Sequence, residues 1–228
     1  MINANRAAES FVIFHATSPL ACGGNRKHTE AYMTGKLSVT ASVCFAVVMA
    51  SFTALGQPGS RVECCFTIKS ESMMPTLETG LSVAAFRYSD PSQPQPGDII
   101  AFLYEKKSSI DIKRLIAVQG DRIQMIAGAL HLNGQPVKRE RVDDFPYRDQ
   151  SGRTISIKRW RETLPNSMQY DTLDMIDNGF YDNTPIYAVP SGHFFVMADN
   201  RDNGIDSRIL TEIGYVPFNN IIGRAVRR

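Results

Sequence analysis

Residues 97–134 read "GDIIAFLYEKKSSIDIKRLIAVQGDRIQMIAGALHLNG", a series of short apolar runs separated by polar turns. Runs of this kind are typical of strands. The segment "LNGQPV" at 132–137 contains the Asn-Gly signal of a tight hairpin. Several short strands at close spacing, with few helical periods, predict an all-β fold with antiparallel pairing. The expected strands are residues 81–86, 98–104, 113–118, 121–126, 128–132 and 193–199.

Residues 138–190 are more polar and irregular than the runs around them. This composition indicates an appended subdomain or a long hairpin. The Pro-rich stretch "PSQPQPG" at 91–97 is expected to be a loop, because proline cannot donate to a strand ladder. A chain of 228 residues can hold one globular domain with a sizeable core, with or without appendages.

A charge-free stretch precedes the β-rich region, since residues 37–60 contain no Lys, Arg, Asp or Glu. Its first part, "LSVTASVCFAVVMASFTALG" at 37–56, has the length of a transmembrane helix, which needs about 20 residues. The flank before it is basic, so the positive-inside rule places residues 1–36 in the cytoplasm and residues 57–228 outside. A cleaved secretory signal ending near Ala54-Leu55-Gly56 is the alternative, but 36 residues is long for a basic leader region.

The charge and the cysteines exclude some classes of protein. A net charge of +2 is too small to indicate a nucleic-acid groove. Zinc motifs normally separate paired cysteines by two to four residues, a spacing that none of the four cysteines shows. They are Cys22, Cys44, Cys64 and Cys65. We therefore expect no metal and no disulfide framework.

The stretch "KSESMMPTLETG" at 69–80 suits neither a long helix nor a central strand. Pro75 lacks an N–H and favours an extended Met74 before it. A strand that ends here would leave Ser72 at its mouth with bulky apolar side chains beside the hydroxyl. Two interpretations follow from these residues, a packed turn or a nucleophile in an apolar substrate cleft.

A nucleophilic serine needs a base. His131 lies in a predicted hairpin strand and His193 in a predicted turn, and such histidines are more often structural or surface residues than catalytic ones. A lysine can serve instead if it is neutral, which requires an apolar environment. Lys113 is the best candidate, because Ile112 precedes it and "LIAV" follows one residue later.

Four segments together resemble a known family. They are "SESMMPTLETG", "QPGDIIAF", "IKRLIAVQGDRI" and "ADNRDNGIDSR". They occur in the order and approximate spacing of the conserved boxes of type I signal peptidases, the bacterial leader peptidases. The resemblance covers roughly residues 60–228, including "YVPFNNIIGRA", which is similar to the last strand of the family. It implies a mainly β, antiparallel catalytic domain with an inserted smaller β subdomain at roughly 123–190, preceded by one N-terminal transmembrane helix.

The resemblance also implies roles for individual residues. Ser72 would be the nucleophile and Lys113 the general base, with an oxyanion hole made by the Ser72 N–H and the Ser70 hydroxyl. The residues matching the walls of apolar pockets for small side chains are Ile68, Met73, Leu77 and Ile112. The residues matching the structural support of the site are Asp199, Asn200, Arg201, Asp202 and Gly204, together with an ion pair of Asp206 and Arg208.

The chain departs from the family pattern at several positions. Gly204 stands where most members have a serine that hydrogen-bonds the catalytic lysine. Ala198 replaces a usual glycine, Lys69 a common proline and Asp111 a common tyrosine. A water or another side chain could orient the lysine, and Ser207 is the nearest hydroxyl in sequence. We expect Gly204→Ser to keep or modestly raise the rate unless position 204 needs positive φ.

The implied protein is a single-pass endopeptidase of the cytoplasmic membrane with its catalytic domain on the periplasmic or extracytoplasmic side. It would cleave signal peptides of exported preproteins after Ala-x-Ala sequences, with signal peptides and membrane lipid as partners, no nucleic acid and no cofactor. One alternative is a specialised maturation peptidase of the same fold for one secretion or conjugation substrate. Another is a catalytically silent, membrane-tethered binding protein. A self-cleaving repressor is disfavoured, because it would need no membrane span.

Overall fold

The computed structural model describes residues 62–89, 93–149 and 151–228. The expected cytoplasmic segment at 1–36 and the expected span at 37–56 lie outside the described residues. Within the part of the chain that is described, no helix is long and apolar enough to cross a membrane.

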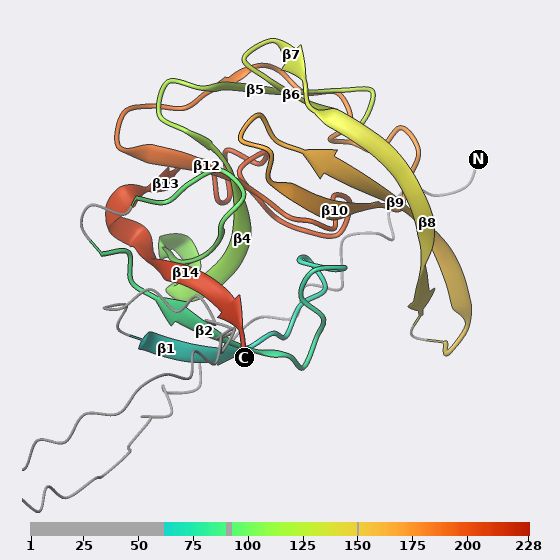
Figure 1. Ribbon diagram of the computed structural model, residues 1–228, viewed down its shortest axis with the longest axis horizontal. Coiled ribbons are helices and arrows are strands. Elements are labelled where there is room, and N and C mark those ends of the chain that lie inside the picture. The colour runs from blue at the N-terminus through green and yellow to red at the C-terminus, as the bar shows by residue number, and fades with distance from the viewer. Residues whose placement is uncertain (1–61, 90–92, 150) are drawn as a thin grey trace, which may run out of the picture.

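The main sheet has seven strands, all paired antiparallel (Figure 1). Their spatial order is β1 (Val62–Thr67), β2 (Ser82–Phe86), β14 (Ile221–Arg227), β3 (Ile99–Tyr104), β4 (Ser109–Val118), β12 (His193–Met197) and β13 (Val216–Pro217). The last long strand of the chain, β14, lies between β2 and β3, so the C-terminal segment completes the sheet. The prediction of a mainly β, antiparallel fold is confirmed.

The strand β4 begins four residues earlier than expected from the sequence. The β3–β4 hairpin pairs continuously from Ile99 opposite Arg114 to Tyr104 opposite Ser109. The helical turn η1 (Glu105–Lys107) connects the two strands and ends at Ser108, whose φ is 47°. This register draws residues 109–112 into the strand, and it puts Asp111 and Lys113 on the same face.

A second sheet contains the expected tight hairpin. Its order is β11 (Tyr187–Ala188), β5 (Arg122–Ile126), β6 (Ala129–Leu132) and β7 (Gln135–Pro136). Asn133 and Gly134 connect β6 to β7 with φ values of 54° and 80°. Two successive positive φ angles are what a type I′ turn requires, so the Asn-Gly signal predicted this connection correctly.

A third sheet is built from the segment that looked irregular. Its order is β10 (Gln169–Asp174), β9 (Thr154–Thr163) and β8 (Lys138–Arg148), and the long β8–β9 hairpin extends away from the main sheet (Figure 1). Most of β8 is exposed or only partly buried, so its sequence shows no apolar alternation. Polar contacts between strands replace it, such as the Arg139–Asp174 ion pair at 2.9 Å and the Arg139 guanidinium 3.9 Å from the Trp160 ring.

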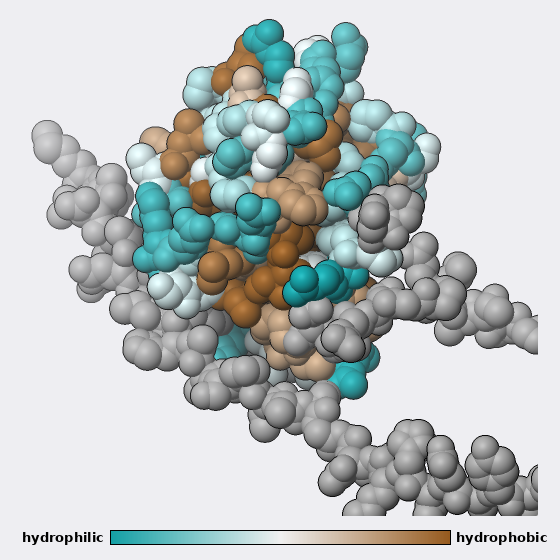
Figure 2. All heavy atoms as spheres, turned by 90° about the vertical axis from the view of Figure 1, so that its left-hand side faces the viewer, coloured by the Kyte–Doolittle hydropathy of each residue, from teal (hydrophilic) through white to brown (hydrophobic). Residues whose placement is uncertain are grey.

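The buried side chains form several separate clusters. One cluster joins β4 and β12 to the β5–β6 hairpin and contains Ile116, Met125 and Phe195. A second, with Phe102, Leu115 and Val196, lies within the main sheet. Seen from the side on which β13 and β14 lie in Figure 1, hydrophobic residues also gather at the centre of the surface between hydrophilic ones (Figure 2).

Candidate active site

Residues 68–81 form a closed turn that follows β1. The Ile68 N–H donates to the Leu81 carbonyl and the Gly80 N–H to the Ile68 carbonyl, both at 2.8 Å. Within the turn, the Leu77 N–H donates to the Met73 carbonyl at 2.8 Å. The strand before Ser72 therefore ends, as expected, and Ser72 lies with both of its chain neighbours inside a loop closed by hydrogen bonds.

The two methionines after Ser72 anchor this turn to two different sheets. Met73 is 2% exposed and packs in a cluster with residues of β2, β3, β4 and β14. Met74 packs instead against Ile157 and Leu173 of the third sheet. A hydrogen bond from Tyr147 of β8 to the Glu71 carboxylate strengthens the second contact. Ser72 thus precedes two residues that pack against the main sheet and the β8–β9–β10 sheet, respectively.

The structure brings Lys113 next to Ser72, although 41 residues separate them in the chain. The Lys113 Nζ lies 3.2 Å from the Ser72 Oγ, and the residues are 2% and 6% exposed. A second hydroxyl is close, since the Ser70 Oγ lies 3.1 Å from the Ser72 Oγ. A buried amine within hydrogen-bond distance of a serine is the geometry that proton transfer from that serine requires.

The other partners of the Lys113 amine come from its own strand. The Asp111 Oδ1 lies 2.7 Å from Nζ, and the Ile112 carbonyl oxygen 3.2 Å. Among the described residues, the hydrogen-bond partners of the Lys113 amine do not include Ser207, whose hydroxyl accepts from the Val196 N–H at 2.9 Å. The sequence left open whether a water or another side chain orients the lysine, and the side chain that the structure brings to the amine besides Ser72 is Asp111.

Position 204 has no room for a side chain. A Cβ placed on Gly204 would lie 2.5 Å from the Ala198 Cβ and 3.2 Å from the Ser72 Cβ. The φ of Gly204 is not in the left-handed region, unlike that of Gly192, so the obstacle is steric and not conformational. Gly204→Ser would therefore strain this site, because the methyl group of Ala198 fills the space that the serine would need, and the expected effect on the rate stays a prediction.

The four apolar residues expected around the substrate lie in one buried cluster beside Ser72. This cluster also contains Val83, Ala85, Ala101 and Ala225 of the main sheet. The four are Ile68, Met73, Leu77 and Ile112, which are 7%, 2%, 3% and 9% exposed.

Asp199 and Arg114 form a buried ion pair directly behind the turn. Both guanidinium–carboxylate distances are 2.7 Å, and the Thr76 hydroxyl donates to the same carboxylate at 2.6 Å. Burial opposes the charge of Arg114, but the Asp199 carboxylate outweighs it, so the pKa of Arg114 is raised above its usual value. The pair therefore stays charged and ties the turn to β4.

Asn200 and Arg201 connect the turn to the third sheet. The Asn200 N–H donates to the Ser72 carbonyl, and the Arg201 N–H to the Leu173 carbonyl of β10, both at 3.0 Å. The Arg201 guanidinium contacts the buried Glu162 carboxylate at 2.5 Å. Burial opposes the charge of Arg201 and Glu162 outweighs it, so the pKa of this guanidinium is raised.

The rest of this segment is held by two aspartates. The Asp202 carboxylate accepts the N–H groups of Met175 and Ile176, which follow β10. Asp206 and Arg208 form the expected ion pair at 2.8 Å, with side chains 0% and 2% exposed. Asp206 also accepts the Ala198 N–H at 3.0 Å, so the pair fixes the backbone that faces Ser72.

The sequence interpretation missed Arg114, Glu162 and Thr76. Arg114 and Glu162 are ionisable residues inside strands and are nonetheless 4% and 1% exposed. A charge within an apolar run such as "KRLIAV" is the signal that could have found Arg114. Nothing local distinguishes Glu162 in "RWRETL", because its burial depends on Arg201 from a distant segment.

Two other features of the surface lie apart from Ser72 and Lys113. The His131 and His193 rings contact backbone carbonyls two residues before them, of Ala129 and Ser191, which agrees with structural roles.

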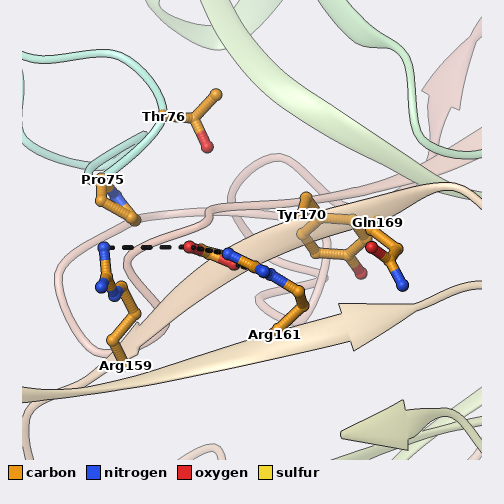
Figure 3. Close-up of a pocket in the computed structure, with 7 residues that line it drawn as sticks. Pro75, Thr76, Arg159, Arg161, Gln169 and Tyr170 are labelled. Atoms are coloured by element: carbon orange, nitrogen blue, oxygen red, sulfur yellow. Dashed lines mark hydrogen bonds and ion pairs between the residues drawn. The ribbon is translucent and has the colours of Figure 1, made fainter. Parts of the chain in front are cut away.

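Figure 3 shows a pocket on the third-sheet side of the turn. Its lining residues are Pro75, Thr76, Arg159, Arg161, Gln169, Tyr170 and Asp171.

Comparisons with known proteins show the family of the chain. The family described as signal peptidase, peptidase S26, matches residues 36–228. The chain is 36% identical over 140 residues to a signal peptidase I of Rickettsia typhi, covering 58% of this chain and 51% of the relative. It is 37% identical over 139 residues to a signal peptidase I of Rickettsia bellii, covering 58% and 46%. The chain thus spans about half the length of the curated relatives that it matches.

A solved structure is also similar to part of the chain. It is the crystal structure of a signal peptidase I from Enterococcus faecalis, with 24% identity and a TM-score of 0.35. The match covers 58% of this chain and 97% of that one.

Proposed function

Because this chain belongs to the signal peptidase family, peptidase S26, we propose that it is a membrane-anchored serine endopeptidase that removes signal peptides from exported preproteins. The observation that carries the proposal is the buried contact of 3.2 Å between the Lys113 Nζ and the Ser72 Oγ. A lysine amine and a serine hydroxyl held together in a buried contact form the pair that proton transfer from the serine requires.

In the proposed reaction, neutral Lys113 takes the proton of the Ser72 hydroxyl while Oγ attacks the scissile carbonyl carbon. The resulting oxyanion accepts hydrogen bonds from the Ser72 N–H and the Ser70 hydroxyl. The tetrahedral intermediate then collapses, and the Lys113 ammonium gives its proton to the leaving amine. Water, deprotonated by the same lysine, hydrolyses the acyl-serine and regenerates the enzyme.

The partly buried contact of 3.1 Å between Ser70 and Ser72 supports the oxyanion role. A hydroxyl that lies beside the nucleophile can turn towards the carbonyl oxygen once Oγ has bonded to carbon. We expect Ser70→Ala to lower kcat by about a hundredfold to a thousandfold, the usual loss for one oxyanion donor, with little change in KM.

The substrate would bind as an extended strand beside the turn, with small pockets for the side chains before the cleaved bond. Ile68, Met73, Leu77 and Ile112 would wall these pockets, because they pack together next to Ser72. Ala or Gly should be accepted at the −1 position, and larger or charged residues rejected. Efficient cleavage after Lys or Phe would contradict this assignment of the pocket.

The anchor would be the charge-free segment 37–56, with residues 1–36 in the cytoplasm and residues 57–228 outside. A reporter fused at residue 30 should behave as cytoplasmic, and one fused at residue 228 as exported. If both reporters were found on the same side, the peptidase would have no access to translocated signal peptides and the proposed function would fail.

The decisive experiment is cleavage of a mixed set of preproteins by the purified full-length chain. Wild type should release signal peptides, whereas Ser72→Ala and Lys113→Ala should each abolish release without unfolding the protein. The double variant should be scarcely worse than either single variant, because residues that act as one unit are not additive. Release of signal peptides by Ser72→Ala would refute the proposal.

A further inference from the structure

The partners of the Lys113 amine differ in what they can do with a hydrogen. The Asp111 carboxylate, at 2.7 Å, and the Ile112 carbonyl, at 3.2 Å, can only accept. The Ser72 hydroxyl, at 3.2 Å, can also donate. A neutral amine has two N–H groups and one lone pair. When both N–H groups of the neutral amine point to the two acceptors, the lone pair faces the hydroxyl, which is the orientation a base needs. When the amine carries its third proton, the same contact with Asp111 is an ion pair.

The Asp111 carboxylate is itself fixed in place. Its Oδ1 accepts the N–H of Ile112 at 2.8 Å in addition to the Lys113 amine. Asp111 lies opposite Phe102 in the continuous β3–β4 pairing, so its backbone cannot shift without breaking the hairpin. The carboxylate thus reaches the amine from a rigid strand, on the same face two residues away.

A side chain at position 204 cannot orient the amine instead. A Cβ on Gly204 would point at the Ser72 Cβ, 3.2 Å away, so this position lies beside the nucleophile. A hydroxyl side chain there is blocked by the Ala198 Cβ at 2.5 Å. Ala198 and Gly204 therefore fit each other in size, and together they leave the orientation of the lysine to another residue.

We infer that Asp111 is the positioning residue of Lys113, holding its amine with the lone pair towards Ser72 in place of a hydroxyl at position 204. This inference rests on the proposed function. It predicts that the carboxylate acts on the chemical step and not on substrate binding, because Asp111 acts only through Lys113.

The test measures kcat and KM of the full-length chain on one preprotein with an Ala-x-Ala site. Asp111→Ala should lower kcat by about tenfold to a hundredfold, the usual effect of losing one hydrogen bond to a charged group, and change KM by less than about twofold. Asp111→Asn should retain more activity than Asp111→Ala, because its amide oxygen still accepts. Asp177→Ala is the matched control, since it removes a carboxylate that is 71% exposed and pairs with Lys158.

The rescue experiment adds Ala198→Gly and Gly204→Ser together to Asp111→Ala. The glycine opens the space and the serine supplies a new acceptor, so kcat should rise at least about threefold above that of Asp111→Ala. The same pair in the wild-type background is the control. If Asp111 had a merely structural role, a serine at position 204 would not restore the kcat that Asp111→Ala loses.

Two results would overturn the inference. One is an Asp111→Ala variant whose kcat stays within about twofold of wild type. The other is a loss of kcat with a parallel rise in KM that the pair at 198 and 204 does not reverse. Failure of the proposed function gives a different result: the preprotein is cleaved by wild type and is still cleaved by Ser72→Ala. If wild type cleaves no preprotein, the rate at which a serine-directed acylating probe labels Ser72 replaces kcat in the same variants.

Discussion

Removal of the Asp199 carboxylate should destabilise the protein far more than removal of a similar carboxylate at the surface. The Asp199 carboxylate accepts hydrogen bonds from two nitrogens of the Arg114 guanidinium, both at 2.7 Å, and from the Thr76 hydroxyl at 2.6 Å. The Arg114 and Asp199 side chains are 5% and 1% exposed. In Asp199→Ala the arginine stays charged and buried, and two of its donors lose their acceptor.

The magnitude follows from this burial. Breaking a buried ion pair by removing one partner costs about 3–5 kcal/mol, because the remaining charge is uncompensated. Arg114 keeps its bond of 2.7 Å to the Gly97 carbonyl and its position over the Tyr170 ring, which favours the lower end of that range. For a domain of this size, 1 kcal/mol shifts the Tm by about 2–4 °C, so a loss of about 3 kcal/mol should lower the Tm by about 6–12 °C.

The chain offers a matched control with the same chemistry. Asp171 receives two nitrogens of Arg161, at 2.8 and 3.1 Å, in the same forked geometry. The Arg161 side chain is 44% exposed, so water can solvate it when its partner is removed. Asp171→Ala should cost less than about 1 kcal/mol, which is the range of exposed ion pairs.

The assay is thermal and denaturant unfolding of wild type, Asp199→Ala, Asp199→Asn and Asp171→Ala under one set of conditions. Asp199→Asn should lie nearer to Asp199→Ala than to wild type, because it keeps the volume but not the charge. Equal losses for the two alanine variants would refute the argument, since burial is the property that distinguishes the two pairs. Preprotein cleavage by Asp199→Ala should fall too, because Thr76 belongs to the turn that carries Ser72, the proposed nucleophile.

Four further changes have definite expected results. Lys113→Arg should abolish cleavage while the fold is kept, because a guanidinium cannot be deprotonated in a protein; substantial turnover would show that the base lies elsewhere. Gly204→Ser should cost about 1–3 kcal/mol through overpacking, measured as a lower Tm, and Ala198→Gly should reverse most of that loss. Met74→Ala should cost about 2–5 kcal/mol and loosen the turn, whereas a loss below 1 kcal/mol would mean that Met74 does not anchor it. Burial, together with neighbouring carboxylates, raises the pKa of Asp182, so its charged form disfavours folding above the unfolded pKa of about 4. Asp182→Asn should therefore be slightly more stable at pH 7, by about 0.5 kcal/mol or less after solvent screening, and this difference should vanish below about pH 4.

Local patterns in the sequence were enough to predict the mainly β fold, most strands of the main sheet and the Asn133-Gly134 hairpin. These features depend on neighbours within a few residues, through apolar runs and the φ angles that a tight turn requires. The same patterns singled out Ser72 and Lys113, one by its place before Met-Met-Pro and the other by its apolar neighbours. Their roles stay proposals, but the structure brings the two side chains together.

Only the tertiary structure decided which polar groups meet. For the β8–β9–β10 sheet the sequence predicted only a long hairpin or an appended subdomain and not the individual strands, because ion pairs between its strands replace the apolar alternation by which strands are recognised. The contact of Lys113 with Asp111 depends on the register of β3 against β4, and the clash at Gly204 depends on Ala198 across a folded loop. Distances of 2–4 Å between side chains are set by packing that joins distant segments, and no periodicity of the chain encodes them.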